Sequence, residues 1–116
     1  MQAVTVMMQQ QLNKIAELND HARRTFTGCR VIFTAGIAAL PQQTQHSIIA
    51  TVQRYDDFTQ DNDPYAEHDF GSFTCQNHHV FWKWDYFDLD LQMASLDPSV
   101  AEITTRILTI MLAHEY

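Results

Sequence analysis

The chain has 116 residues, 46% of them hydrophobic and 11% aromatic, which predicts a single domain with its own core and excludes intrinsic disorder. Its 14 acidic and 7 basic residues give a net charge of −7, which argues against direct binding to DNA or RNA. No apolar run approaches the roughly 20 residues that span a bilayer, and no basic region followed by an apolar run opens the chain. We therefore expect a cytoplasmic protein without membrane contact.

An amphipathic helix is predicted over residues 3–24, because apolar residues recur there at spacings of three and four. This apolar stripe consists of Val4, Met8, Leu12, Ile15, Leu18 and Ala22. The pair Thr27-Gly28 breaks the helix, and the β-branched run over residues 29–34 predicts a strand. A second helix is predicted over residues 41–55, because Pro41 suits a first helical turn.

A β-hairpin is predicted over residues 69–75 and 79–88, around the turn Gln76-Asn77-His78. The second strand alternates, so that Trp82, Trp84 and Tyr86 share one face. We expect this aromatic face to pack against the helices, since large aromatic side chains dominate ordinary cores.

A third helix is predicted over residues 97–114, because Asp97 suits an N-cap and Pro98 the first helical position. Its core face would be Ile103, Ile107, Ile110 and Met111. The resulting order α-β-α-β-β-α predicts an α+β fold, a two-layer sandwich in which three helices pack on an antiparallel three-stranded sheet.

Acidic residues are concentrated between residues 56 and 90, where nine carboxylates oppose the single base Lys83. The local charge is therefore −8, whereas residues 1–55 sum to +3 and residues 91–116 to −2. The polar loop over residues 56–68 is long for a compact domain, and loops of this length are often functional. We expect the acids to gather on one outward-facing surface: Asp56, Asp57, Asp61, Asp63, Glu67, Asp69, Asp85, Asp88 and Asp90.

Several short stretches carry a resemblance to a known family. They are Arg24-Thr25-Phe26-Thr27-Gly28, Thr34-Ala35-Gly36, Asp56-Asp57-Phe58-Thr59, Asp61-Asn62-Asp63-Pro64, Glu67-His68-Asp69-Phe70-Gly71, Phe81-Trp82-Lys83, Asp85-Tyr86, Thr104-Thr105-Arg106, residues 108–113 and Glu115-Tyr116. From Asn19 to its C-terminus the chain resembles a small bacterial domain family of unknown function, frequently encoded on plasmids and other mobile elements. The resemblance brings no catalytic assignment. It implies a context of plasmid maintenance or of countering host defence.

A cation site is one alternative use of the loop. Asp57, Thr59, Asp61 and Asp63 alternate in a way that offers oxygen ligands to a hard cation such as calcium. The match to a calcium-binding loop is poor, because Asn62 stands where that loop has its glycine. Ordinary turn chemistry, in which Asp and Asn side chains accept backbone N–H groups, is the competing interpretation.

The spacing of residues leaves two further kinds of site open, an acid–base site and a zinc site. Glu67, His68 and Asp69 place carboxylates beside an imidazole, a combination that can move protons near neutral pH. Cys75, His78 and His79 lie within five residues and could bind zinc, with Cys29 as a fourth ligand. Cys29 and Cys75 are too few for a disulfide framework, so we expect reduced buried thiols and leave a bridge between them open.

We predict a protein-binding module without catalytic or metal-binding residues and without a cofactor. Its predicted partner-binding residues are Asp56, Asp57, Asp61, Asp63, Tyr65, Glu67, Asp69, Asp85, Asp88 and Asp90, with Phe58 and Trp82 as further anchors. The expected partner is the basic nucleic-acid-binding groove of a host defence complex, such as a restriction or CRISPR effector, which the acids would occupy by imitating nucleic acid. The alternative is a small metal-dependent or acid–base enzyme that uses the loop from Asp61 to Asp69. The oligomeric state is left open.

Overall fold

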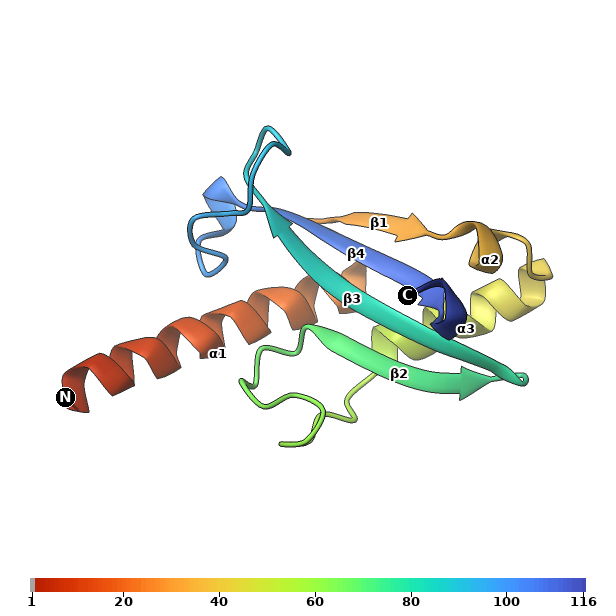
Figure 1. Ribbon diagram of the computed structural model, residues 1–116, viewed down its shortest axis with the longest axis horizontal. Helices are drawn as coiled ribbons and strands as arrows, with labels where there is room; N and C mark the ends of the chain where they lie inside the picture. The colour runs from red at the N-terminus through yellow and green to blue at the C-terminus, as the bar shows by residue number, and fades with distance from the viewer. Residues whose placement is uncertain (1) are drawn as a thin grey trace.

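The computed structural model describes residues 2–116, and Figure 1 shows its helices packed against one sheet. The helices are α1 (Gln2–Thr25), α2 (Ala35–Ala38) and α3 (Gln42–Arg54), and the strands are β1 (Arg30–Phe33), β2 (Phe70–Cys75), β3 (His78–Phe87) and β4 (Thr105–Leu112). Two short 3₁₀ helices cover Ala101–Ile103 and Ala113–Glu115. The α+β class, both long helices, the first strand and the hairpin are confirmed.

The third helix predicted over residues 97–114 is wrong, because residues 105–112 form the strand β4. Its inward positions alternate, and Arg106, Leu108 and Ile110 are all buried. The capping chemistry expected of Asp97 is present, but it stabilises a turn instead of a helix. The backbone N–H and the hydroxyl of Ser99 donate to Asp97 Oδ1 at 3.0 and 2.6 Å.

The sheet has four strands in the order β1-β4-β3-β2, so the prediction of three antiparallel strands is also wrong. β4 pairs in parallel with β1 and antiparallel with β3, and β3 pairs antiparallel with β2. The C-terminal strand therefore fills the middle of the sheet, which makes the sheet mixed.

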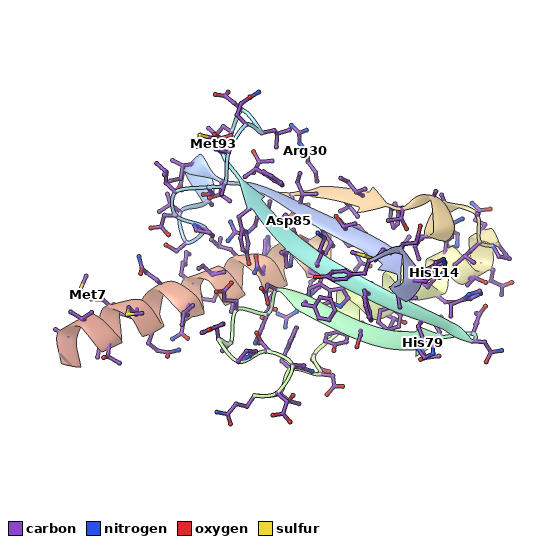
Figure 2. All side chains as sticks on the ribbon, viewed as in Figure 1. Met7, Arg30, His79, Asp85, Met93 and His114 are labelled. Carbon is purple, nitrogen blue, oxygen red and sulfur yellow. The ribbon has the colours of Figure 1, made fainter. Side chains whose placement is uncertain are left out.

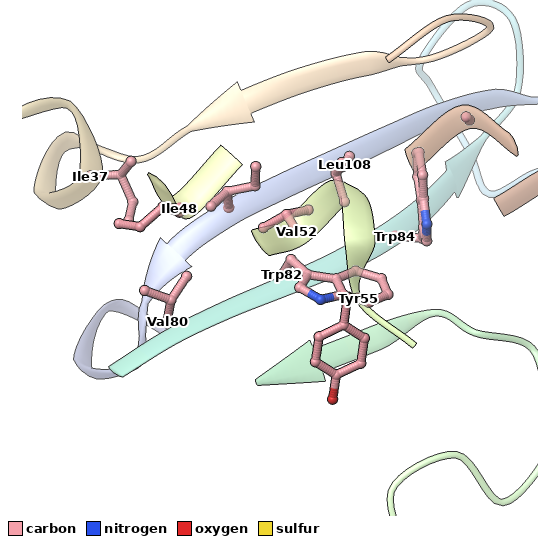
Figure 3. Close-up of a cluster of buried hydrophobic side chains, with 10 residues drawn as sticks. Ile37, Ile48, Val52, Tyr55, Val80, Trp82, Trp84 and Leu108 are labelled. Atoms are coloured by element: carbon pink, nitrogen blue, oxygen red, sulfur yellow. The ribbon is translucent and has the colours of Figure 1, made fainter. Parts of the chain in front are cut away.

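The aromatic face predicted for β3 is confirmed as part of the core. Figure 3 shows Trp82 and Trp84 on the same side of the sheet as Ile48 and Val52 of α3, and all four side chains are buried. Gly71 of β2 stands opposite Trp82 in the sheet register. A side chain there would collide with the indole, because a Cβ atom would lie 2.2 Å from its Nε1.

Helix α1 is buried along its second half only. Ile15, Ala16, Asn19, Ala22 and Arg23 are buried, whereas every residue from 3 to 11 is exposed. In Figure 1 the first half of α1 extends beyond the end of the sheet. The apolar stripe of this helix therefore serves the core at one end and faces solvent at the other. No helix in the described part of the chain is long and apolar enough to cross a membrane.

Candidate functional site

The loop that follows α3 is ordered by its own polar residues. Asn62 Oδ1 accepts the N–H of Thr59 at 2.8 Å, and Asn62 Nδ2 donates to the carbonyl of Asp57 at 2.8 Å. The N–H of Asp63 donates to the carbonyl of Thr59 at 2.8 Å. These are the side-chain bonds of turn chemistry, and they hold a long loop in one conformation.

Asp63 is a structural residue and is not available to a partner. Its carboxylate is buried and accepts the backbone N–H groups of Glu67 at 3.1 Å and of His68 at 3.3 Å. Both acceptor bonds fold the second half of the loop, where Ala66 and His68 have a positive φ of 55°. The prediction that Asp63 contacts a partner is therefore not supported by its position.

Glu67 and Asp69 are half-buried beneath the loop. Burial raises the pKa of Glu67 above its usual range, and the nearby carboxylates of Asp69 and Asp63 raise it further. Burial also raises the pKa of Asp69. The hydroxyl of Tyr86 hydrogen-bonds to Glu67 and accepts Asn19 Nδ2 at 2.8 Å. These two acids thus belong to a polar network between the loop, α1 and β3.

His68 ties the loop to α1 through an acid that sequence reasoning missed. Its Nδ1 lies 2.9 Å from Oδ2 of Asp20, and its ring stacks on Phe58 with centroids 4.0 Å apart. Asp20 also pairs with the buried guanidinium of Arg23 at 3.0 Å. No local signal could have revealed this contact, because Asp20 and His68 are 48 residues apart in the sequence.

The arrangement of Asp20 and His68 resembles the base half of an acid–base site, in which a carboxylate orients an imidazole. The second ring nitrogen of His68, Nε2, lies 3.7 Å from Asp63 Oδ2. Both nitrogens therefore face carboxylates of the protein, and a substrate would have to displace Asp63 to reach the ring.

The acidic residues between 56 and 90 do not form one surface. Asp56, Asp57 and Asp61 are exposed together on the loop. Asp85 pairs with Lys83 at 3.1 Å on β3, where Figure 2 labels it. In Figure 1 the loop 56–68 lies at the bottom of the view, whereas residues 88–94, which carry Asp88 and Asp90, lie at the top. The expectation that all the acids gather on one surface is therefore wrong, because β3 separates the loop 56–68 from the segment 88–94.

Two of the three predicted anchors are unavailable. Trp82 is fully buried in the core, and Phe58 is half-buried against Tyr55, Trp82 and the guanidinium of Arg23. Tyr65 differs, since 71% of its surface is exposed. It is the aromatic residue of the loop that can contact a partner.

Tyr65 also lines a hollow that sequence reasoning missed. This hollow, of about 370 Å³, is lined by Met8, Gln11, Leu12, Ile15, Tyr65, Leu96, Asp97 and Pro98. A second hollow, of about 450 Å³, shares Met8 and includes Val4, Met7 and Lys14. Met7 and Leu96 are 64% and 95% exposed. The sequence did contain the signal, the apolar stripe on α1, but the expected packing of this helix on the sheet holds for its second half only.

The candidate metal ligands are not arranged as a site. Within residues 2–116, no group of three or more His, Cys, Asp or Glu side chains is placed to hold a metal ion. Cys29 and Cys75 are free thiols, and burial raises the pKa of Cys29. His79 Nδ1 lies 3.1 Å from the hydroxyl of Thr74 on the neighbouring strand.

Comparisons with known proteins bear on the family. No curated protein and no solved structure matches the chain. The family model described as "Protein of unknown function (DUF3768)" matches residues 33–115, from the end of β1 to the 3₁₀ helix at the C-terminus. This match covers well over half of the chain and agrees with the resemblance seen in the sequence motifs. The chain belongs to the DUF3768 family of proteins of unknown function.

Proposed function

We propose that the protein binds another protein through a surface that joins the exposed acids of the loop to the exposed apolar side of α1. We call it the loop–helix surface and define it by Val4, Met7, Met8, Asp56, Asp57, Asp61, Tyr65 and Leu96, all of which are exposed. The observation that carries this proposal is the position of Tyr65. It belongs to the acidic loop and lines the same hollow as Met8 and Leu96.

The composition of the loop–helix surface is that of a protein interface. Contiguous apolar patches larger than a few hundred Å² are uncommon on monomers and mark interaction sites. Interfaces typically have an apolar centre with Met and aromatic residues and a polar rim. Met7, Met8, Tyr65 and Leu96 are exposed and line two adjoining hollows, so we assign them to the centre, and we assign the exposed aspartates of the same loop to the acidic rim.

The chemistry of the surface specifies its partner. We infer a partner that presents an apolar ridge flanked by Lys or Arg side chains, because an acidic rim attracts basic surfaces and repels nucleic acid. The narrower proposal is inhibition of a host nucleic-acid-binding defence complex. Asp56, Asp57 and Asp61 support it, since all three are exposed on the same loop. Asp88 and Asp90 are left out of that surface, because the segment 88–94 lies at the top of the view in Figure 1 and the loop 56–68 lies at the bottom.

An acid–base or metal-dependent enzyme is the second candidate, favoured by the distance of 2.9 Å between Asp20 and His68. Thermal melting with calcium, magnesium, manganese and zinc separates it from the binding proposal. An ion that binds the folded state raises the melting temperature with its concentration. Such a rise, reversed by a chelator, would favour the enzyme, whereas the binding proposal expects none.

The binding proposal is tested by using the immobilised protein to capture partners from host-cell lysate at low and high salt, with quantitative mass spectrometry as the readout. The variant Tyr65→Ser/Leu96→Ser removes two apolar anchors. We expect it to lower recovery of the partner at least tenfold, since buried anchors at interfaces contribute more than about 1 kcal/mol each. The variant Asp57→Asn/Asp61→Asn should weaken the salt dependence and slow association.

The matched control is Asp90→Asn/Glu102→Gln, which removes the same charge from exposed positions outside the loop–helix surface. It should capture the partner as the wild type does, with the same salt dependence. All three variants alter exposed residues, so their melting temperatures should stay near that of the wild type. A partner recovered equally well by the Tyr65→Ser/Leu96→Ser variant would remove this surface from the interface.

A further inference from the structure

The charge of Arg106 is buried without an acid beside it. Arg106 is the second residue of β4 and is 3% exposed. Its Nε donates to Asn19 Oδ1 at 2.9 Å, its Nη2 donates to the carbonyl of Pro98, and its guanidinium lies 5.3 Å from the centroid of the Tyr86 ring. These partners are all neutral, and no carboxylate among residues 2–116 forms an ion pair with Arg106. Burial of an unpaired charge is costly.

The second buried arginine, Arg23, has the carboxylate partner that Arg106 lacks in the described part of the chain. Arg23 donates to the carbonyl of Val52 at 2.8 Å and to Asp20 at 3.0 Å, so its charge is balanced by a carboxylate. Arg23 Nε is sealed from solvent and has no hydrogen-bond partner among residues 2–116. Arg106 Nη1 also makes no hydrogen bond within the described chain, but it is not among the sealed atoms. One nitrogen of Arg106, Nη1, is therefore without a hydrogen bond in the described chain and is not completely sealed from solvent.

Arg106 lines a hollow of about 240 Å³, together with Gly28, Cys29, Arg30, Thr104 and Thr105. A smaller hollow, of about 90 Å³, shares Gly28, Thr104 and Arg106 and also touches His21. Among the described residues, no carboxylate lines either space. In a chain whose net charge is −7, a hollow lined by two arginines and by no acid of the described residues favours an anion.

The surroundings of Arg106 allow an anion to approach. Arg30 is exposed, forms no ion pair within residues 2–116, and pairs with Ile107, so it lies one position from Arg106 in the register and its side chain leaves the opposite, outer face of the sheet. Because Arg30 and Arg106 both line the hollow, the long side chain of Arg30 can reach a ligand there from the outer face. Gly28 has a φ of +68°, and the space that a Cβ atom would occupy there is empty. The backbone of residue 28 is thus accessible from the hollow.

We propose that this hollow binds a small dianionic oxoanion of the phosphate class, either free phosphate or the phosphoryl group of a small phosphomonoester. Arg106 supplies the fixed cation from below, and Arg30 supplies the mobile one from outside. The guanidinium of Arg30 has a fork of N–H groups that matches the spacing of two phosphate oxygens, and Nη1 of Arg106 can donate to a further oxygen. A doubly charged ligand balances the two arginines, whereas a single carboxylate leaves one charge unpaired.

The test is a titration followed by amide chemical shifts in NMR spectra, with ionic strength held constant by chloride. The probes are inorganic phosphate, glycerol 3-phosphate and acetate. We expect saturable shifts at residues 28–30 and 104–106 with the two phosphates, and weaker binding of acetate. Stronger binding of glycerol 3-phosphate than of phosphate would identify the phosphomonoester as the ligand, and the reverse order would identify free phosphate.

Two variants sharpen the test, Arg30→Gln and the matched control Arg54→Gln. Both residues are exposed, so both variants should fold, and Arg54 lies on α3 away from the hollow. Arg30→Gln should weaken phosphate binding about tenfold, the effect of losing one charge-assisted hydrogen bond, and Arg54→Gln should leave it unchanged. Unsaturable shifts, shifts outside the hollow, or equal affinities of the two variants would overturn the proposal. The loop–helix surface shares no residue with this hollow, so the two proposals fail independently.

Discussion

Replacement of Asn19 by leucine tests whether the polar network under the loop stabilises the fold. Asn19 is fully buried on α1. Its Oδ1 accepts Arg106 Nε at 2.9 Å, and its Nδ2 donates to the carbonyl of Glu67 at 3.0 Å and to the hydroxyl of Tyr86 at 2.8 Å. Leucine has a similar volume and no polar atoms. It would leave the buried guanidinium and the Glu67 carbonyl without these partners.

The expected loss follows from the groups that remain. A buried group left without its partner costs about 1–3 kcal/mol, and a charged one costs more, so Asn19→Leu should lower the free energy of unfolding by about 4 kcal/mol. Domains of this kind have about 5–15 kcal/mol in total, so the variant should be marginally stable. Urea unfolding, followed by the fluorescence of the buried Trp82 and Trp84, measures the loss.

Asn13→Leu is the matched control for this experiment. It makes the same substitution on the exposed half of the same helix, where Asn13 accepts only an exposed bond from Gln9. We expect it to change the free energy of unfolding by less than about 0.5 kcal/mol. If Asn19→Leu also lowered the free energy of unfolding by less than about 1 kcal/mol, the network would not be needed for stability. The claim that the buried guanidinium of Arg106 depends on its bond to Asn19 would then be refuted.

Two further predictions concern Gly71, which faces Trp82 in the core, and Glu67, which belongs to the network. Gly71→Ala should lower the free energy of unfolding by about 1–3 kcal/mol, because its Cβ would meet Trp82 at 2.2 Å. Urea unfolding measures this loss, with Ser72→Ala, a change at an exposed neighbour, as the control. Equal free energies of unfolding for the two variants would contradict the prediction. Glu67→Gln tests the raised pKa of Glu67. When a carboxyl group has a higher pKa in the folded than in the unfolded state, stability falls as the pH rises above the unfolded value. The variant and the wild type should therefore have a constant difference in melting temperature well below the ordinary pKa of 4.5, and the variant should gain relative stability as the pH rises. A difference in melting temperature that is independent of pH would contradict the prediction.

The C-terminal third shows where sequence patterns stop predicting the fold. Ile103, Ile107 and Ile110 have helical spacing, and Asp97 precedes them like an N-cap. The same segment is rich in Thr and Ile, which favour strands. A charged residue, Arg106, occupies an inward position and hides the alternation. The choice was decided by tertiary contacts, since β4 is held between β1 and β3, whose residues lie far away in the sequence.

The candidate site shows the same limit at the level of side chains. Local sequence identified the loop, its turn-forming residues and Tyr65. It could not identify Asp20 as the partner of His68, nor Asn19 as the link between Arg106 and Tyr86, because these contacts span 48 to 87 residues. Patterns report what neighbouring residues do together, and they carry little information on which distant elements meet.

The acidic residues of the loop and its end therefore have two different roles, which a count of charges cannot separate. Asp63 accepts backbone N–H groups, and Glu67 and Asp69 are half-buried, so the charges of these residues belong to the architecture that fastens the loop to α1 and β3. The carboxylates of Asp57 and Asp61 accept no hydrogen bond from the described part of the chain, and both residues are exposed. Their replacement should alter association without altering stability, whereas replacement of Asp63 should unfold the loop. A variant that changes Asp57, Asp61 and Asp63 together would mix the two effects, which is why the binding experiment leaves Asp63 intact.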